Sequence, residues 1–541
     1  MLKLTDLVNY KIAANGRLSD GEILKDLIKD DRISEEKREM ADGAHYFGVK
    51  NDILKQDFRK YTTTKKSPDS LNEYEEEYTD KNKANNRLAH GFHRRLVLEK
   101  VSYLLKEMPT FSHTDKALIQ RIMDFVGKDF HETLITWAEN ASNKGREWLH
   151  VFWDGAVFDY MVMDAQEIIP VYETSRQKKL VQLIRYYPVR VKTGQSEVLV
   201  TGGQVYKHRE PVKKIKEDVR YYAEWWHPDR VEKWEEGEAG EFNMVSSEPH
   251  FSLEGSQGDN LPGSWGEVPF IELKNNVQCW SDLRFIKSLI DDYDRSASVL
   301  SNNFEDLQEV FVFGSGMTDS GAELRHNLRK HKAGTSGDAE AKIQFFSVEI
   351  PHQGRMEQLK NLEENIFANG MGINPKSDKL GNDPSGVALR WMYVPLDLKA
   401  GLLERRIDNA IRKFFELVSK AMVINGDDGF NADEIEIELN KFMIANESKQ
   451  IDDVEKSKSI SRKTKLKHHP WVDNPEEEIK EIEKDDVGGE DIGKIPLAIQ
   501  QLALAKQRAI DTGNIDEATK IATTIDSLLS KISKNGATNE K

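Results

Sequence analysis

The sequence lacks most of the features that mark secreted or membrane proteins. Its 541 residues include a single cysteine, Cys279, so an intrachain disulfide framework is excluded and a reducing compartment is the natural inference. No apolar run approaches the length of a membrane span, and the first residues lack the apolar core of a signal peptide. We therefore expect a soluble protein with no membrane association.

Sequence motifs of enzymes are also missing. The chain contains no GxxxxGK[ST] phosphate-binding loop, no HExxH, no CxxC pair and no GxSxG elbow. The nearest metal-like pattern is His90 and His93, which a helix would place on one face. A metal site needs three or four ligands, and the neighbouring Arg94 would repel a cation. Surface histidines are the better interpretation, and we expect no metal, no cofactor and no catalytic residues.

Positive charge is in deficit. The chain has 77 Lys and Arg against 93 Asp and Glu, a net charge of −16. Tight wrapping by nucleic acid normally needs a basic surface that displaces counterions, so this balance argues against it. The charge remains compatible with a protein surface that binds DNA weakly and past which DNA slides.

What the sequence does contain is a succession of helical and strand patterns that predicts an α+β fold. Between turn residues, Val, Ile, Tyr and Trp alternate with polar residues in the manner of antiparallel strands. Polar or Gly- and Pro-rich stretches between the patterns predict loops. The helical patterns fall in 1–60, 87–108, 115–128 and 129–142, the strand patterns in 146–275, and the expected loops in 65–86, which is acidic and exposed, and 252–267.

The stretch from Trp280 to Gly401 is the most informative part of the chain. From Leu283 to Leu307, apolar residues recur at steps of three and four, which predicts one helix of about 27 residues and roughly 40 Å. A strand–helix–strand module is predicted over 308–350, and a second helix over 355–370 could run antiparallel to the first. A stalk that long exceeds what one compact core requires, so we expect assembly with further copies of the chain.

The second helix is followed by a segment that cannot be regular structure. Residues 371–386 are crowded with Gly, Pro, Asn and Asp. A long helix is predicted over 387–424, with a kink at Pro395 because proline removes a backbone hydrogen bond. A strand in 433–444 returns the chain to the α+β body, and 447–541 is helical and charged.

Two groups of residues are candidates for contact with DNA phosphates. The first is a cationic cluster in the module, for which a solvated face or a contact with a partner protein has at least equal weight. The second lies in the irregular segment, where an inert surface loop is an equal alternative and one aspartate could cap the next helix. The cluster consists of Arg325, His326, Arg329, Lys330 and Lys332, and the loop group of Lys376, Lys379, Asn382 and Asp383.

An acidic run on the first long helix is the remaining candidate for chemistry. Asp291, Asp292 and Asp294 flank apolar positions. We interpret them as a solvated or inter-subunit face rather than a catalytic carboxylate pair.

At this point the order of the segments resembles one protein family. The matching pieces extend over about residues 85–485, and their specificity lies in their number and order. The chain resembles the portal, or head-to-tail connector, proteins of tailed bacteriophages, particularly long-tailed phages of Gram-positive hosts. The pieces include NNRLAHGFHRRLVLEKVSYLLKEMPTF, ASNKGREWLHVFWD, VPFIELKNN, SDLRFIKSLIDDYDRSASVLSNNFEDLQEVFVFGSG, LGNDPSGVALRWMYVPLDLKAGLLERRI and SKSISRKTKLKHHPWVDNPEEEIKEIEKD.

The resemblance implies a ring, typically of twelve subunits, around a channel for double-stranded DNA. It implies a place in the virion at one capsid vertex, with assembly in the host cytoplasm. The implied partners are the terminase large subunit, a head-completion (adaptor) protein, and the major capsid and scaffolding proteins. The implied parts are a wing (1–275 and 426–446), a stem (276–307 and 351–374), a clip (308–350), a tunnel loop (375–386), a kinked tunnel helix (387–425) and a crown (447–541).

Two functions of other kinds stay open on the sequence alone. A metal-dependent nuclease would use scattered carboxylates such as Asp291, Asp292 and Asp294. A helical scaffold protein without a DNA role would form no ring with an open pore. The irregular loop that directly follows the stalk is better explained by a DNA channel than by either alternative.

Overall fold

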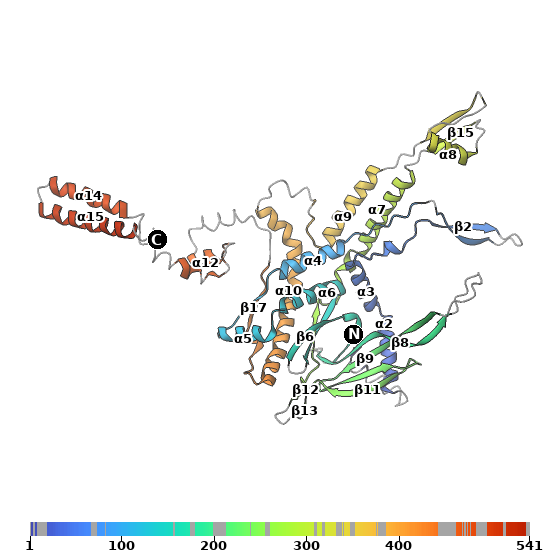
Figure 1. Cartoon of the computed structure of the whole chain (residues 1–541), viewed down its shortest axis with the longest axis horizontal. Coiled ribbons are helices and arrows are strands. Elements are labelled where there is room, and N and C mark those ends of the chain that lie inside the picture. The colour runs from blue at the N-terminus through green and yellow to red at the C-terminus, as the bar shows by residue number, and fades with distance from the viewer. Residues whose placement is uncertain are drawn as a thin grey trace. The chain divides into compact units, whose positions relative to one another are not determined.

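Helices and strands are mixed along the chain in the computed structural model (Figure 1). The chain divides into two compact units, Met1–Met443 and Ile444–Lys541. The structure describes residues 2–3, 6–7, 19–66, 73–81, 83–154, 157–173, 179–198, 212–238, 240–254, 260–307, 311–315, 320–331, 338, 340–346, 352–374, 376, 386–441, 461–467, 469, 472, 474–475, 478–482, 495–511 and 515–536.

Three of the five helices described in the first 150 residues begin at a side-chain cap that the sequence supplies. Ser19 and Glu22 form a capping box at the start of α2, and the Ser34 and Asp115 side chains accept backbone N–H groups at α3 and α5. The predicted helical character is confirmed for the segments that form α2 to α6, whereas Leu2–Lys3 forms strand β1 and residues 8–18 lie outside the described residues. The bounds are α2 Asp20–Arg32, α3 Glu35–Phe47, α4 Phe92–Leu105, α5 Lys116–Val126 and α6 Phe130–Lys144, with a 3₁₀ turn, η1, at Asp52–Lys55.

The expected antiparallel strands form two sheets. The larger has the order β1-β7-β8-β9-β10-β11, in which only β1 pairs in parallel, with β7; the smaller has the order β14-β5-β6. The bounds are β1 Leu2–Lys3, β5 Arg146–Asp154, β6 Val157–Met163, β7 Ile168–Tyr172, β8 Leu180–Val198, β9 Val212–Trp226, β10 Arg230–Glu236, β11 Phe242–Pro249 and β14 Phe270–Lys274.

Two stretches expected as loops contain β-hairpins. In 65–86, β3 (Glu73–Thr79) pairs with β2 (Lys60–Lys66), which places three threonines and one lysine opposite glutamates and stacks Tyr61 on Tyr78. In 252–267, β12 (Phe251–Glu254) pairs with β13 (Asn260–Gly263). The composition of these stretches, acidic in the first and rich in Gly and Pro in the second, predicted loops. Composition does not reveal which residues face each other across paired strands, so it could not predict the hairpins.

The main core lies between helices and the smaller sheet. The long helix α10 (Gly386–Asn425) buries one face against it, and the Phe130 and Phe414 rings stack at 5.0 Å. The predicted extent of this helix is confirmed, with Pro395 inside it; the kink stays a prediction. A short antiparallel pairing joins β4 (Thr110–Ser112) to β17 (Glu436–Glu438). The body also contains two 3₁₀ turns, η2 (Ala165–Glu167) and η5 (Ala432–Glu434).

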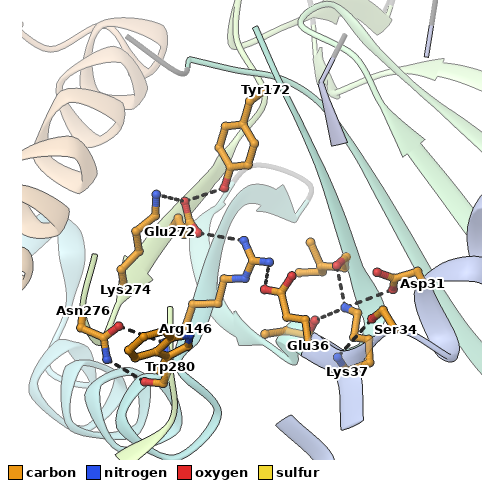
Figure 2. A network of polar contacts seen from close by, with 12 residues as sticks. Asp31, Ser34, Glu36, Lys37, Arg146, Tyr172, Glu272, Lys274, Asn276 and Trp280 are labelled. Carbon is orange, nitrogen blue, oxygen red and sulfur yellow. Dashed lines mark hydrogen bonds and ion pairs between the residues drawn. The ribbon is translucent and has the colours of Figure 1, made fainter. Parts of the chain in front are cut away.

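A buried ionic network joins α3 to both sheets (Figure 2). The Arg146 side chain is 4% exposed and pairs with Glu36 of α3 and with Glu272 of β14, at 3.2 Å from the latter. Glu272 also accepts a hydrogen bond of 2.6 Å from the Tyr172 hydroxyl. Next to it, the Lys37 ammonium donates to the Ile168 carbonyl at 2.8 Å. Because each buried charge has partners, the network fixes α3 on the sheets at a tolerable desolvation cost.

An antiparallel helix pair carries the strand–helix–strand module. Helix α7 (Lys287–Leu307) lies beside α9 (His352–Asn369), with Ile290 packed near Ile366, and the module follows at the far end of α7 (Figure 1). The module consists of β15 (Phe311–Ser315), α8 (Gly321–His331) and β16 (Lys342–Phe346), as predicted.

The first long helix is shorter than expected. A 3₁₀ turn, η3 (Asp282–Phe285), precedes α7, and Ile286 between them has φ −131°. Helix α7 therefore has 21 residues. The apolar periodicity runs across this break because Leu283 and Ile286 are buried in the same cluster as Ile290.

The second unit is helical where it is described, as predicted. It contains α12 (Arg462–Lys467), α14 (Ile495–Asp511) and α15 (Ile515–Gly536), of which the last two pack together. Among the described residues of the chain, no helix has the length and apolar character that crossing a lipid bilayer requires.

Candidate functional site

The structure describes only some side chains of the cationic cluster that we expect in the module. His326 and Lys330 lie exposed on α8. Arg325 and Arg329 belong to the same helix, and Lys332 lies outside the described residues. The cluster's role therefore stays a prediction.

The expected loop group is represented by one residue. Lys376 lies seven residues beyond the end of α9, and its side chain is 74% exposed. Its ammonium lies 3.1 Å from a carboxylate oxygen of Glu363 on that helix. Lys379, Asn382 and Asp383 lie outside the described residues. One lysine of the pair thus contacts α9 through Glu363.

A buried ion cluster, which the sequence did not reveal, lies where α4, η3, α9 and α10 meet. The Asp282 carboxylate, 6% exposed, is 2.7 Å from the Lys100 ammonium and 3.1 Å from that of Lys399. Lys399 also donates to the carbonyl of Gly370, after the last turn of α9, at 2.9 Å. Asn275 donates to Asp282 at 2.8 Å. One carboxylate thus connects the base of α7 to the end of α9 and to α10; we call this set of residues the Asp282 cluster.

The electrostatics of the Asp282 cluster hold its carboxylate ionised. Burial alone would raise the pKa of Asp282, but the two ammonium groups of Lys100 and Lys399 outweigh it and lower that pKa. Burial, together with the charge of Lys399, lowers the pKa of Lys100 to about 8. The ion pairs of the Asp282 cluster therefore hold η3, α4 and α10 together, and their strength depends on the charges of the three side chains.

A second feature explains the acidic run on α7. Residues 84–90, which we call the strap, lie in extended conformation along this helix. Alternate backbone N–H groups of the strap donate to side chains spaced four residues apart on α7. The rungs are Ala84 to Asp306 at 2.7 Å, Asn86 to Asn302 at 2.6 Å, Leu88 to Ser298 at 2.9 Å and His90 to Asp294 at 3.1 Å.

The expectation of a solvated face is therefore wrong for Asp294, whose side chain is fully buried beneath the strap and also accepts from Asn51 at 2.6 Å. The neighbouring carboxylates point to other partners: Asp291 to Tyr46 and Lys287, and Asp292 to Arg295. The three aspartates do not converge on one point, so the geometry does not favour a catalytic carboxylate pair.

The interpretation of His90 and His93 as surface histidines is wrong for His93. His93 is 1% exposed on α4, and its Nε2 lies 2.9 Å from the Asn143 side-chain oxygen. Burial lowers the pKa of His93 to about 4, so the ring is neutral. His90 precedes the helix and pairs with Asp294 at 2.7 Å. The two rings therefore have separate partners; among the described residues, no group of three or more His, Cys, Asp and Glu is arranged to hold a metal ion.

The architecture defines a class: a mixed α and β body with an antiparallel helix pair, a small module at its end, and a long helix that follows it. The family model for phage portal proteins of the SPP1 Gp6-like type matches residues 26–488. The chain belongs to this family.

Named relatives agree with the family. The portal protein of Bacillus phage SPP1 is 29% identical over 472 residues, 83% of this chain and 86% of the relative. The portal protein of Clostridium phage phiCD119 is 29% identical over 459 residues, 82% of this chain and 91% of the relative. A solved structure titled as the neck of a native GTA particle computed with C12 symmetry covers 70% of this chain and 88% of its own, at 11% identity and a TM-score of 0.36.

Proposed function

We propose that the chain forms the portal ring of a tailed phage, with twelve copies around a channel for double-stranded DNA. In this proposal the helix pair α7 and α9 is the stem and the β15–α8–β16 module is the clip. The body up to β14, with residues 426–446, is the wing, and residues 447–541 are the crown. The support is family membership over most of the chain, together with relatives that are named portal proteins.

The observation that supports the mechanism is that the exposed Lys376 lies between the end of α9 at Asn369 and the start of α10 at Gly386. A segment that joins two helices of a ring subunit in this way is suited to face a central channel. Its lysines offer contacts that are weak because they are few and exposed, and tight phosphate contacts would oppose sliding of the duplex. The net charge of −16 acts in the same direction, since an acidic wall repels phosphate.

The partners follow from the position at one capsid vertex. The clip, with its exposed His326 and Lys330, would dock the terminase large subunit during packaging and then exchange it for a head-completion protein and the tail. The wing and crown would contact the major capsid and scaffolding proteins. The terminase would supply the energy, so this chain needs no catalytic residue. The ring would assemble in the host cytoplasm and remain in the virion.

Electron microscopy of the purified protein, viewed down the particle axis, tests the proposal. We expect rings of about twelve copies with a pore that admits a duplex. Monomers or small dimers over a range of salt concentrations would contradict it. Cleavage of DNA by the purified protein in the presence of a divalent metal ion would instead support the nuclease alternative.

A further inference from the structure

Helix α10 exposes a continuous apolar stripe on the face opposite its buried one. Trp391, Val394, Leu398 and Leu402 are spaced by three, four and four residues and are 72%, 41%, 62% and 60% exposed. Helical geometry therefore places these four side chains, the α10 stripe, on one face. The buried face of the same turns carries Leu396, Ala400 and Leu403.

Such a stripe is unusual on a protein that stays alone in water. Monomeric proteins expose single apolar residues freely, but rimmed, contiguous apolar patches mark interaction sites. The rim is basic on balance: Arg390 and Arg405 are exposed beside the stripe, whereas the carboxylates of Asp397 and Glu404 on the same turns both pair with Lys441. The partner surface should therefore be apolar with an acidic rim.

The same unit carries a second exposed apolar surface at the base of α7. Val277 and Phe285 are 72% and 54% exposed, and the Phe285 ring meets the Trp280 ring edge-on at 6.2 Å. The Arg284 guanidinium lies over the Trp280 ring at 4.4 Å. We call these four residues the η3 patch.

Acidic residues of α3 border the η3 patch, with the exposed Arg38 among them. Glu39 of α3 pairs with Arg284. On the same helix, Glu35 is exposed and Asp42 is half-buried. Carboxylates of Glu35 and Asp42 beside the η3 patch can thus meet the guanidinium groups of Arg390 and Arg405 beside the α10 stripe.

A ring requires two different surfaces on each copy. Head-to-tail contacts are heterologous, so one face of a subunit must fit another face of its neighbour. Trp and Arg, present in both surfaces or their rims, are the residue types that most often dominate interface energies. We propose that the α10 stripe of one copy packs on the η3 patch of the next copy, an inference that rests on the ring proposed above.

The two surfaces are linked within each copy. Asp282 lies in the η3 turn and Lys399 lies on α10 beside Leu398, and their 3.1 Å ion pair connects the two elements. Both surfaces are thereby held in place before assembly, which reduces the ordering cost of association. The contact would also couple a displacement of α10 in one subunit to the base of α7 in the next.

Cysteine cross-linking tests the contact because the chain has one native thiol to remove. In a Cys279→Ser background, Leu398→Cys with Phe285→Cys should give covalent oligomers up to ring size when treated with a short bis-maleimide. The matched control is Val423→Cys with Phe285→Cys, since Val423 is also on α10 and 57% exposed, and it should give none.

The outcomes separate the contact from the ring. Intact rings by electron microscopy without cross-linked oligomers would overturn the contact and leave the ring standing. Oligomers from Leu398→Cys alone would also overturn it, because they would indicate a stripe-to-stripe contact. Absence of rings from the unmodified protein would overturn both proposals.

Charge placed on the stripe provides a second test. Leu398→Glu with Leu402→Glu should reduce the fraction of protein in rings by at least about tenfold. The circular dichroism spectrum should not change, because both side chains are exposed in the isolated copy. Val423→Glu is the control and should leave the rings intact. Rings that persist in the double variant would show that the stripe is not the contact.

Discussion

Asp282 shows how much a single buried side chain can determine in this protein. It compensates two ammonium groups, of Lys100 and Lys399, that would otherwise repel each other in a largely buried site. The sequence could not predict this, since the three residues are far apart in the chain and each has an ordinary helical or turn context. By contrast, the exposure of Lys376 follows from its Gly-, Pro- and Asn-rich surroundings, which the sequence shows directly.

We expect Asp282→Asn to destabilise the protein by about 3–5 kcal/mol, because it leaves two buried positive charges without a carboxylate. The matched control is Asp292→Asn, which removes an exposed pair with Arg295 and should cost less than about 1 kcal/mol. Urea denaturation at one fixed protein concentration measures both values. Equal effects of the two substitutions would contradict the importance assigned to the Asp282 cluster.

Lys100 gives the stability a specific pH dependence. Its pKa is about 8 in the folded state and about 10.4 in an unfolded chain, so between these values the unfolded state binds more protons. The free energy of unfolding of the wild type, relative to Lys100→Met, should therefore rise as the pH increases from 8 to 10, by about 3 kcal/mol at most. A difference that stays flat or falls over this interval would show that Lys100 is not held with a lowered pKa.

Among the elements, helix periodicity made α4, α5, α6 and α10 predictable, because one apolar face packs on the core. The strap could not be predicted, because it depends on which extended segment lies beside α7 and in which register. The short polar acceptors Asp294, Ser298, Asn302 and Asp306 recur every four residues, and this signal could have indicated a partner along the helix. The two hairpins were missed for a related reason, since pairing between strands is not encoded in composition.

The glycines that end α5 and α6 give a prediction about the space available for a side chain at each helix end. Gly145 has φ +93°, and a Cβ there would lie 2.1 Å from the Cys279 carbonyl oxygen. Gly127, which ends α5, has φ +87° but open space around it. Gly127→Ala should thus cost only the conformational strain, about 1–3 kcal/mol, whereas Gly145→Ala should cost at least about 2 kcal/mol more because backbone must move. Thermal unfolding of both variants measures the difference, and equal melting temperatures would contradict it.

For the complete chain, the order of the parts was predictable because many short sequence segments, taken in order, match the family. The surfaces that would join copies were not, since exposure of an apolar helix face is visible only once the opposite face is known to be buried. The α10 stripe illustrates this: its residues continue the same apolar pattern as the core. The proposed channel loop makes a prediction at this level.

Lys376→Ala with Lys379→Ala should leave ring assembly intact while altering the amount of DNA packaged or retained in phage capsids. The reason is that Lys376 is exposed and its pair with Glu363 is a surface contact, which contributes little to folding. Lys25→Ala with Lys29→Ala is the control, because it removes two exposed lysines from α2. Normal packaging and retention by rings of the first variant would remove these lysines from the mechanism.

The strap also limits which changes of length the protein can accept. Four helical residues advance about 6.0 Å, and two extended residues advance about 6.6 Å, so successive rungs stay in step only approximately. The difference accumulates to roughly 2 Å over three intervals, which gives a physical reason for a ladder of about four rungs. One residue inserted in 84–90 would turn every later N–H away from the helix, and one inserted in α7 would rotate every later acceptor by about 100°. Natural insertions and deletions should therefore avoid both segments, although about two hundred residues separate them in the sequence.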